Sequence, residues 1–313
     1  MTISNLHPAT SARLLLVVLS LIWGLTWVAM RVALDEVTPW TMRTIGYIFG
    51  LTFLLLWALA QHRSLGLQRG RDWAHVFMAS LFNVVGFGIF SAFAILDAAT
   101  SRVIIVVYSM PVWASLMAWI VLRERIGLNA AAGLILCLTG LSILVGPVIG
   151  VDSLNGLMLA MGCSLCWAGG TVYMKWAAIR GDIVAITAWQ VALGIIAMFS
   201  MRLAFDGPPT FEPLAMRTWL AIAFAGFLGS GLAYAIWFSI IDKVPTSTAA
   251  LGVLTNPVVG VVGAIIILGD RPPLPDLIGF AFIFAAAACV LLKPAPPTPA
   301  VTESSAGPRP PQA

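Results

Sequence analysis

The sequence predicts an all-α integral membrane protein whose ten transmembrane helices form two inverted five-helix repeats around a central cavity. Three observations lead to this prediction. Of the 313 residues, 60% are hydrophobic and only 10% are charged; the charges occur in short clusters; and the second half of the chain repeats the first. Soluble globular chains carry roughly 25% charged residues, so the composition excludes that class. The surplus of four positive charges is small and gives no reason to expect a nucleic-acid partner.

Ten stretches of the chain contain no Asp, Glu, Lys or Arg, and each is close to the length that a bilayer requires. A transmembrane helix needs about 20 mainly apolar residues, within a range of roughly 17–25. The first and last stretches are short, but Arg13, Arg31 and Lys293 can extend from their ends towards water. We therefore predict ten helices in contact with the lipid bilayer. The charge-free windows are 14–30, 44–62, 73–96, 103–122, 126–151, 153–174, 183–201, 218–241, 244–269 and 277–292.

The two ends of the chain are predicted to flank the membrane region. The first span is too long for the apolar core of a secretory signal and lacks a small-x-small cleavage site. We expect it to be retained, after a short cytoplasmic N-terminus at residues 1–13. Residues 293–313 are rich in Pro, Ala, Ser and Thr and are predicted to be disordered. The longest loop, about 202–217, is too short for a folded soluble domain, so the function must reside within the membrane.

The basic residues predict the orientation in an inner membrane. With a cytoplasmic N-terminus, 11 of the 17 Lys and Arg residues lie inside and 6 outside, and the positive-inside rule then favours both termini in the cytoplasm. The inner set is Arg13, Arg63, Arg69, Arg71, Arg123, Arg125, Lys175, Arg180, Lys243, Lys293 and Arg309. The outer set is Arg31, Arg43, Arg102, Arg202, Arg217 and Arg271.

The repeat appears when residues 14–149 are aligned with residues 153–292. "SLIWGLTWVAMR" (20–31) matches "SLCWAGGTVYMK" (164–175) at an offset of 144, and "LRER" (122–125) matches "LGDR" (268–271) at an offset of 146. Each repeat holds five helices, an odd number, so the second copy enters the membrane upside down, as in many secondary transporters. Further pairs at the offset of 146 are Trp73 and Trp219, Thr100-Ser101 and Thr246-Ser247, Pro111 and Pro257, and Gly133 and Gly279.

Two prolines fall in the middle of symmetry-related helices. Pro111 and Pro257 lie ten residues after Ser101 and Ser247, or about 15 Å at 1.5 Å per residue. That is half of a hydrocarbon core about 30 Å thick. A proline frees the carbonyl one turn upstream, and a free carbonyl at this depth must face protein or a water-filled cavity. We favour the cavity; a kink used only for packing is the alternative.

These features resemble paired EamA domains of the drug/metabolite transporter superfamily over about residues 14–292. The resemblance rests on the Trp-Gly/Ala turn in helices one and six, the mid-helix prolines, and the "LRER" and "LGDR" helix ends. It implies a cavity among helices 1, 3, 4, 6, 8 and 9, as in the YddG-type exporters of aromatic amino acids. Tyr108, Trp167 and Phe87 match positions at which those exporters carry aromatic residues, whereas Met110 stands where an aromatic residue would be expected.

The candidate cavity residues are aromatic or polar side chains, and the two central prolines, on these helices. Aromatic rings at span ends are usually interfacial anchors, but Trp23 and Trp167 lie deeper and are symmetry mates. The polar members can orient a zwitterion or join helices, a contact worth about 0.6 kcal/mol on average, and the sequence leaves both roles open. The set is Trp23, Thr26, Trp27, Phe82, Asn83, Phe87, Tyr108, Pro111, Trp167, Tyr234, Trp237, Thr255, Asn256 and Pro257.

The ionisable and sulfur-containing residues predict neither a cofactor nor ion coupling. No window holds an Asp or Glu, whereas carriers driven by protons or ions usually have an intramembrane carboxylate. This favours a facilitator or an exchanger. Cys163 and Cys166 have the C-x-x-C spacing of a redox or metal pair, but no other ligand is near, and we interpret them as small packing residues. We expect no metal and no cofactor.

The leading hypothesis is a facilitative exporter of small metabolites, which exports amino acids and prefers aromatic ones; outward transport follows from the resemblance. An exporter or exchanger of another metabolite or drug is the alternative. An intramembrane enzyme would need a nucleophile with its base, a carboxylate pair or a metal cluster, and the sequence has no HExxH or G-x-S-x-G motif. An assembly protein would not need central prolines on symmetry-related helices. We expect a monomer.

Overall fold

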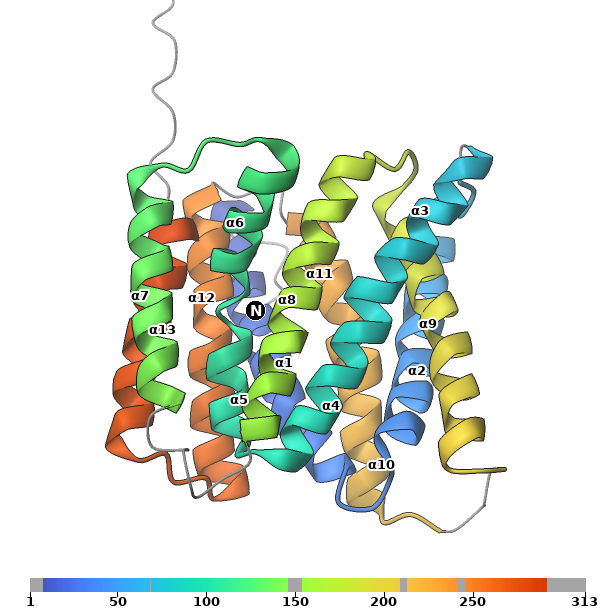
Figure 1. The fold of residues 1–313 in the computed structure, drawn as a ribbon. Coiled ribbons are helices and arrows are strands. Elements are labelled where there is room, and N and C mark those ends of the chain that lie inside the picture. Colours follow the sequence, from blue (N-terminus) through green and yellow to red (C-terminus); the bar gives the residue numbers. More distant parts are fainter. Residues whose placement is uncertain (1–7, 68, 146–153, 209–212, 241–245, 292–313) are drawn as a thin grey trace, which may run out of the picture.

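The computed structural model is a bundle of helices that run side by side (Figure 1). It describes residues 8–67, 69–145, 154–208, 213–240 and 246–291; the predicted tail and residues 1–7 lie outside this part. Within it, eight helices are long and apolar enough to cross a membrane, and two shorter apolar helices cover residues 128–144 and 253–268. The predicted all-α membrane class is thereby confirmed.

The helices follow the charge-free windows in chain order. Three of the apolar stretches contain π-helical segments, labelled η, which occur often at functional sites. The first half holds α1 (Pro8–Ala33), α2 (Pro39–Ala60), α3 (Gly70–Ser80) with η2 (Leu81–Gly86) and α4 (Phe87–Asp97), α5 (Thr100–Val107), α6 (Met110–Leu122) and α7 (Leu128–Val145). The second half holds α8 (Leu154–Ala177), α9 (Ile183–Phe205), α10 (Met216–Ala223) with η4 (Phe224–Leu232) and α11 (Ala233–Ile240), α12 (Thr246–Gly263) with η5 (Ala264–Leu268), and α13 (Leu274–Leu291).

Local sequence signals explain where several helices begin and end. Thr38 caps α2, because its hydroxyl accepts the N–H of Thr41 at 3.2 Å, and Pro39 follows at a position where no N–H is needed. Asp182 caps α9 by accepting the N–H of Val184 at 2.8 Å. Gly269 ends η5 with φ of +77°, a conformation that glycine adopts without strain.

The two halves of the chain are packed into each other. Helix α1 packs against α12, and α8 packs against α5 and α6; α2 packs against α9, and α7 against α13. The α7–α13 contact is close because it is built on glycine: a Cβ atom placed on Gly140 would lie 2.9 Å from the carbonyl oxygen of Gly279. Any larger residue at either position would force these backbones apart.

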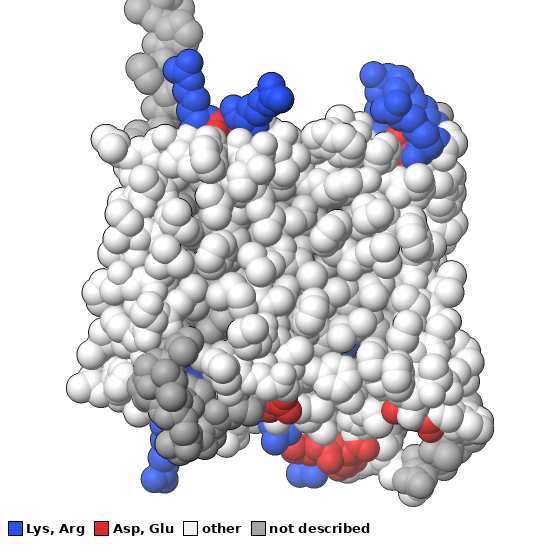
Figure 2. Space-filling view, in the orientation of Figure 1, with Lys and Arg blue, Asp and Glu red and all other residues white. Residues whose placement is uncertain are grey.

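Charged side chains gather at the two ends of the bundle and leave an uncharged belt between them (Figure 2). We call the end that carries Arg123–Arg125 and Lys175 the Arg125 end, and the end that carries Arg102, Asp270 and Asp276 the Asp270 end. Such a belt is what a hydrocarbon core requires.

The ion pairs at the two ends differ in burial. At the Asp270 end, Arg102 donates to the Asp276 carboxylate at 2.7 and 3.0 Å, with 10% and 2% of the two side chains exposed. At the Arg125 end, Lys175 pairs with Glu124 in an exposed contact. Outside the spans, Glu36 accepts the N–H of Ala215 at 2.9 Å, and this bond holds the pKa of its carboxyl below the usual value.

Candidate functional site

The helix that carries Pro111 is interrupted near its middle. α5 ends at Val107 and α6 begins at Met110, so Tyr108 and Ser109 lie between two shorter helices. Proline at the start of α6 needs no N–H partner and sets φ for the new helix. Discontinuous membrane helices of this kind form the substrate sites of many secondary transporters.

Ser109 satisfies the polar groups that this interruption exposes. Its hydroxyl donates to the carbonyl of Val106 at 2.6 Å and accepts the indole N–H of Trp113 at 2.9 Å. The same hydroxyl lies 3.1 Å from that of Ser164 on α8. The break is therefore held by buried hydrogen bonds, as apolar surroundings require.

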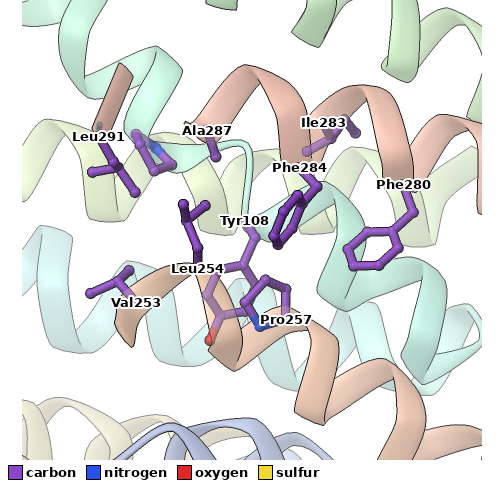
Figure 3. A pocket seen from close by; sticks show the side chains of 10 residues that line it. Tyr108, Val253, Leu254, Pro257, Phe280, Ile283, Phe284, Ala287 and Leu291 are labelled. Atoms are coloured by element: carbon purple, nitrogen blue, oxygen red, sulfur yellow. The ribbon is translucent and has the colours of Figure 1, made fainter. Parts of the chain in front are cut away.

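Pro111 and Pro257 line one pocket between the break at Tyr108 and helices α6, α12 and α13, which Figure 3 shows from close by. Pro257 lies inside α12, which continues past it. The pocket is narrow: its cavity volume is about 10 Å³, which is about the space that one water molecule needs. Its walls are almost wholly apolar, and Tyr108 is the polar residue among them. The other lining residues are Val253, Leu254, Phe280, Ile283, Phe284, Ala287 and Leu291.

Three of the predicted aromatic residues form a row across α1, α4 and α8. The ring of Phe87 lies 6.2 Å from that of Trp27 and 5.1 Å from that of Trp167, centroid to centroid. Counted along their helices, Trp27, Phe87 and Trp167 lie six, ten and thirteen residues from the Asp270 end, or about 9, 15 and 20 Å. The row thus crosses the middle of a core about 30 Å thick.

Tyr108 connects this row to α12. Its hydroxyl faces the polar side-chain groups of Trp27 and Asn256. Asn256 is 3% exposed, and its Oδ1 atom has no hydrogen-bond partner among the described residues. A buried amide oxygen without a partner is costly, and it is a ready acceptor for a ligand's N–H. The row, Tyr108 and Asn256 together make the strongest candidate site.

Three further predicted residues form a separate aromatic group. The ring of Trp23 lies 5.8 Å from that of Tyr234 and 6.0 Å from that of Trp237. The indole N–H of Trp23 donates to the carbonyl of Gly229 at 3.2 Å, so this ring is tied to η4. The structure therefore places Trp23 and its symmetry mate Trp167 in different clusters, each packed on a ring of the other half of the chain.

The remaining predicted residues lie apart from the row. Phe82 packs on Tyr173 at 6.3 Å, and the Asn83 amide donates to Gln190 Oε1 at 3.1 Å on α9. Thr26 bonds back to the carbonyl of Ile22 at 2.7 Å, and Thr255 is exposed.

Gln190 and Ser109 are buried polar residues that the predicted set lacks. Gln190 is 4% exposed and is the one amide side chain in the window 183–201. An isolated amide in an apolar window is the signal by which the sequence indicates a buried polar contact. Ser109 is fully buried and directly precedes the Met-Pro step.

The cysteines show no metal geometry. Within the described residues, no three His, Cys, Asp or Glu side chains come together as ion ligands. Cys163 is buried and its Sγ lies 3.7 Å from the carbonyl of Phe87. Cys166 packs where a Cβ atom on Gly86 would lie 2.7 Å from its sulfur. Both thiols thus occupy packing positions between α8 and the η2–α4 segment.

Comparison with known proteins adds a family and several relatives. The model of the EamA-like transporter family matches residues 10–146 and again residues 154–292. The "Uncharacterized transporter YoaV" of Bacillus subtilis is 24% identical over 76% of this chain and 82% of its own length. The "Probable amino-acid metabolite efflux pump" of Escherichia coli is 24% identical over 80% of this chain and 84% of its own.

A solved crystal structure of another protein has the same fold. It superposes with a TM-score of 0.65 at 22% sequence identity and covers 91% of this chain and 97% of its own. Identity at this level shows the likeness of fold alone.

Proposed function

Because the chain belongs to the EamA-like transporter family, we propose that it exports small metabolites, chiefly amino acids, and prefers aromatic ones. It works by alternating access between two inverted five-helix repeats in a multi-pass membrane protein. The family and the names of the relatives point to a transporter and not to an enzyme. Export is supported by relatives in Escherichia coli and Salmonella typhimurium that are named amino-acid metabolite efflux pumps.

The packing supports the inverted repeat. α1 lies against α12, the helix that carries Pro257, while α8, the match of α1, lies against the α5–α6 pair that carries Pro111. The π-helical segments η2 and η4 also fall at matching positions, since an offset of 146 carries residue 81 to residue 227. Two copies of the same five-helix unit, packed against each other, explain both the helix contacts and the matching π-helical segments.

The aromatic row is the observation that carries the proposed cargo. Ring faces at mid-depth can bind an aromatic side chain, with paired rings worth about 0.5–1.5 kcal/mol beyond burial. Asn256 and the break at Tyr108 add polar groups at the same level. An aromatic amino acid presents both kinds of surface.

Counterflow in proteoliposomes tests the proposal. Vesicles loaded with one unlabelled amino acid should take up the same amino acid in labelled form, fastest for tryptophan and phenylalanine. A panel of amino acids, amines, nucleosides and sugars gives the ranking. Flux of sugars or nucleosides with none for any amino acid would refute the proposed cargo.

The proposed orientation puts the Arg125 end in the cytoplasm. Arg125 and Arg271 are both exposed, one at each end. We expect an impermeant maleimide added to intact cells to label Arg271→Cys and spare Arg125→Cys, in a background with Cys137, Cys163, Cys166 and Cys289 replaced. Lysed cells give full labelling of both as the control. The reverse pattern would contradict the orientation.

We expect transport that runs down the substrate gradient without a proton gradient. Two buried carboxylates of the described helices, Asp72 and Asp276, lie in first turns and not at mid-span, and Asp276 is paired with Arg102. Flux into proteoliposomes should therefore change less than twofold when a protonophore is added. Uphill accumulation driven by an imposed pH gradient alone would contradict this prediction.

A further inference from the structure

A buried arginine lies beside the aromatic row and faces only neutral partners. Arg43 is the fifth residue of α2, and 8% of it is exposed. Its Nε donates to the carbonyl of Gly88 at 3.1 Å, and a terminal nitrogen donates to the hydroxyl of Ser91. The positive-inside count places Arg43 among the outer charges, whereas the structure turns its side chain into the bundle.

The charge of Arg43 lies deep in the membrane. Gly88 is nine residues from the Asp270 end of α4, or about 13 Å along the helix. A charge at that depth is costly unless an opposite charge or a water-filled path compensates it. An arginine in such a place is by default part of a functional site.

The described part of the protein supplies no anion for this guanidinium. Its titratable neighbours are the phenol of Tyr47, whose ring centre lies 5.8 Å from Cζ, and the thiol of Cys163. At their ordinary pKa values, neither the phenol nor the thiol carries a negative charge at neutral pH. The carboxylates in the described ion pairs are Asp35, Asp182, Asp276, Glu124 and Glu36, and they bind other bases.

The guanidinium and the aromatic row share one backbone segment. Phe87 contributes the central ring of the row, and its carbonyl accepts the Ser91 hydroxyl; Gly88, the next residue, binds Arg43. Cys163, one turn before Trp167 on α8, contacts the same Phe87 carbonyl. A positive charge and a set of ring faces therefore lie at one level of the membrane.

We propose that Arg43 binds the carboxylate of the transported molecule, so that the cargo is a carboxylic acid with an apolar or aromatic body. The inference rests on the proposed transport function and names its substrate class. A guanidinium matches a carboxylate with two parallel hydrogen bonds. The hydrogen bond to the Gly88 carbonyl fixes Nε. The Ser91 hydroxyl accepts a hydrogen bond from a terminal nitrogen and can rotate away, which releases that nitrogen for the carboxylate.

The test compares an acid with its analogues that lack one charged group. Proteoliposome flux is measured for phenylalanine, 3-phenylpropionate, phenylalaninamide and phenethylamine. We expect the wild-type protein to carry the two acids much faster than the amide and the amine. Arg43→Gln should lower flux of the two acids at least tenfold and change the slower flux of the amide and the amine less than twofold. Arg202→Gln is the matched control, because Arg202 also binds a hydroxyl and a carbonyl, of Thr41 and Gly207, but at the protein's edge. Arg202→Gln should leave the ratio of acid flux to amide or amine flux unchanged.

Equal losses for acids and amines in a folded Arg43→Gln protein would overturn the proposal. A second measurement does not depend on that variant: phenylalanine should raise the Tm of the wild-type protein, and phenylalaninamide should not. Equal shifts would also overturn it. The two failures are distinct, because a wild-type protein that carries none of the four compounds refutes the proposed cargo, whereas one that carries acids and amines alike refutes only the role of Arg43.

Discussion

Trp167→Ala should lower kcat/KM for tryptophan and phenylalanine at least tenfold and change that for threonine less than twofold. Trp167 ends the aromatic row, 5.1 Å from Phe87, and an aromatic cargo loses a ring face that a threonine side chain does not use. Burial of a large side chain is worth about 1.5–3 kcal/mol, and tenfold in rate corresponds to about 1.4 kcal/mol. Tyr108→Ala should act in the same direction, since Tyr108 joins the row to Asn256. Initial rates in proteoliposomes give the values.

The control is a tryptophan on the outer face of the bundle. Trp119 on α6 is 50% exposed, so Trp119→Ala removes the same side chain away from the row and should leave all three rates within twofold. Folding of each variant is checked by gel filtration in detergent. If Trp167→Ala slows threonine as much as tryptophan, the row packs the bundle and does not choose the cargo.

Asp276→Asn should lower the free energy of unfolding by about 3–5 kcal/mol, because it removes the opposite charge that binds the buried guanidinium of Arg102. The pair is bidentate, at 2.7 and 3.0 Å, and only 2% of the Asp276 side chain is exposed. Thermal unfolding in detergent and denaturant titration both report the change. The replacement keeps the shape of the side chain, so the loss measures charge and not packing.

The exposed pair of Arg31 and Asp35 provides the comparison. Its nitrogen–oxygen distance is 2.6 Å, but its side chains are 37% and 44% exposed, and exposed pairs contribute about 0–1 kcal/mol. Asp35→Asn should therefore have little effect. The double variant Arg102→Gln, Asp276→Asn should regain part of the lost stability, because it removes the buried positive charge together with the carboxylate that bound it. Equal effects of Asp276→Asn and Asp35→Asn would contradict the assignment of a buried pair.

The sequence predicts depth well because charge-free windows and residue spacing both run along the helix axis. It places the charges at two ends, as Figure 2 shows, and brings Pro111 and Pro257 to matching positions that line one pocket. The EamA resemblance agrees with the match to both halves of the chain. The depth of these charges and prolines can be predicted by counting residues from the end of a helix.

The direction in which each side chain points is not predictable in the same way. Trp23 and Trp167 occupy matching positions, and each packs on a ring of the other half of the chain, Tyr234 or Phe87. The sequence does not show that Trp27 joins the second of these pairs to form the row. Arg43 stands at the edge of a charge-free window, where a side chain can reach water or fold inward, and only packing against α4 decides between the two. Membrane helices carry apolar residues on all faces, so periodicity gives little guidance.

The interruption at Tyr108–Ser109 has a mechanical consequence. An unbroken helix behaves as a stiff rod, so a tilt at one membrane surface is carried to the other. Here the helix is interrupted near its centre: α5 is joined through Arg102 to Asp276 on α13, α6 begins at Met110, and both segments pack against α8 and α13. A tilt of α6 is therefore not transmitted through a continuous helix to α5 and its ion pair, and we expect the Arg125 end of the protein to open while the Asp270 end stays closed.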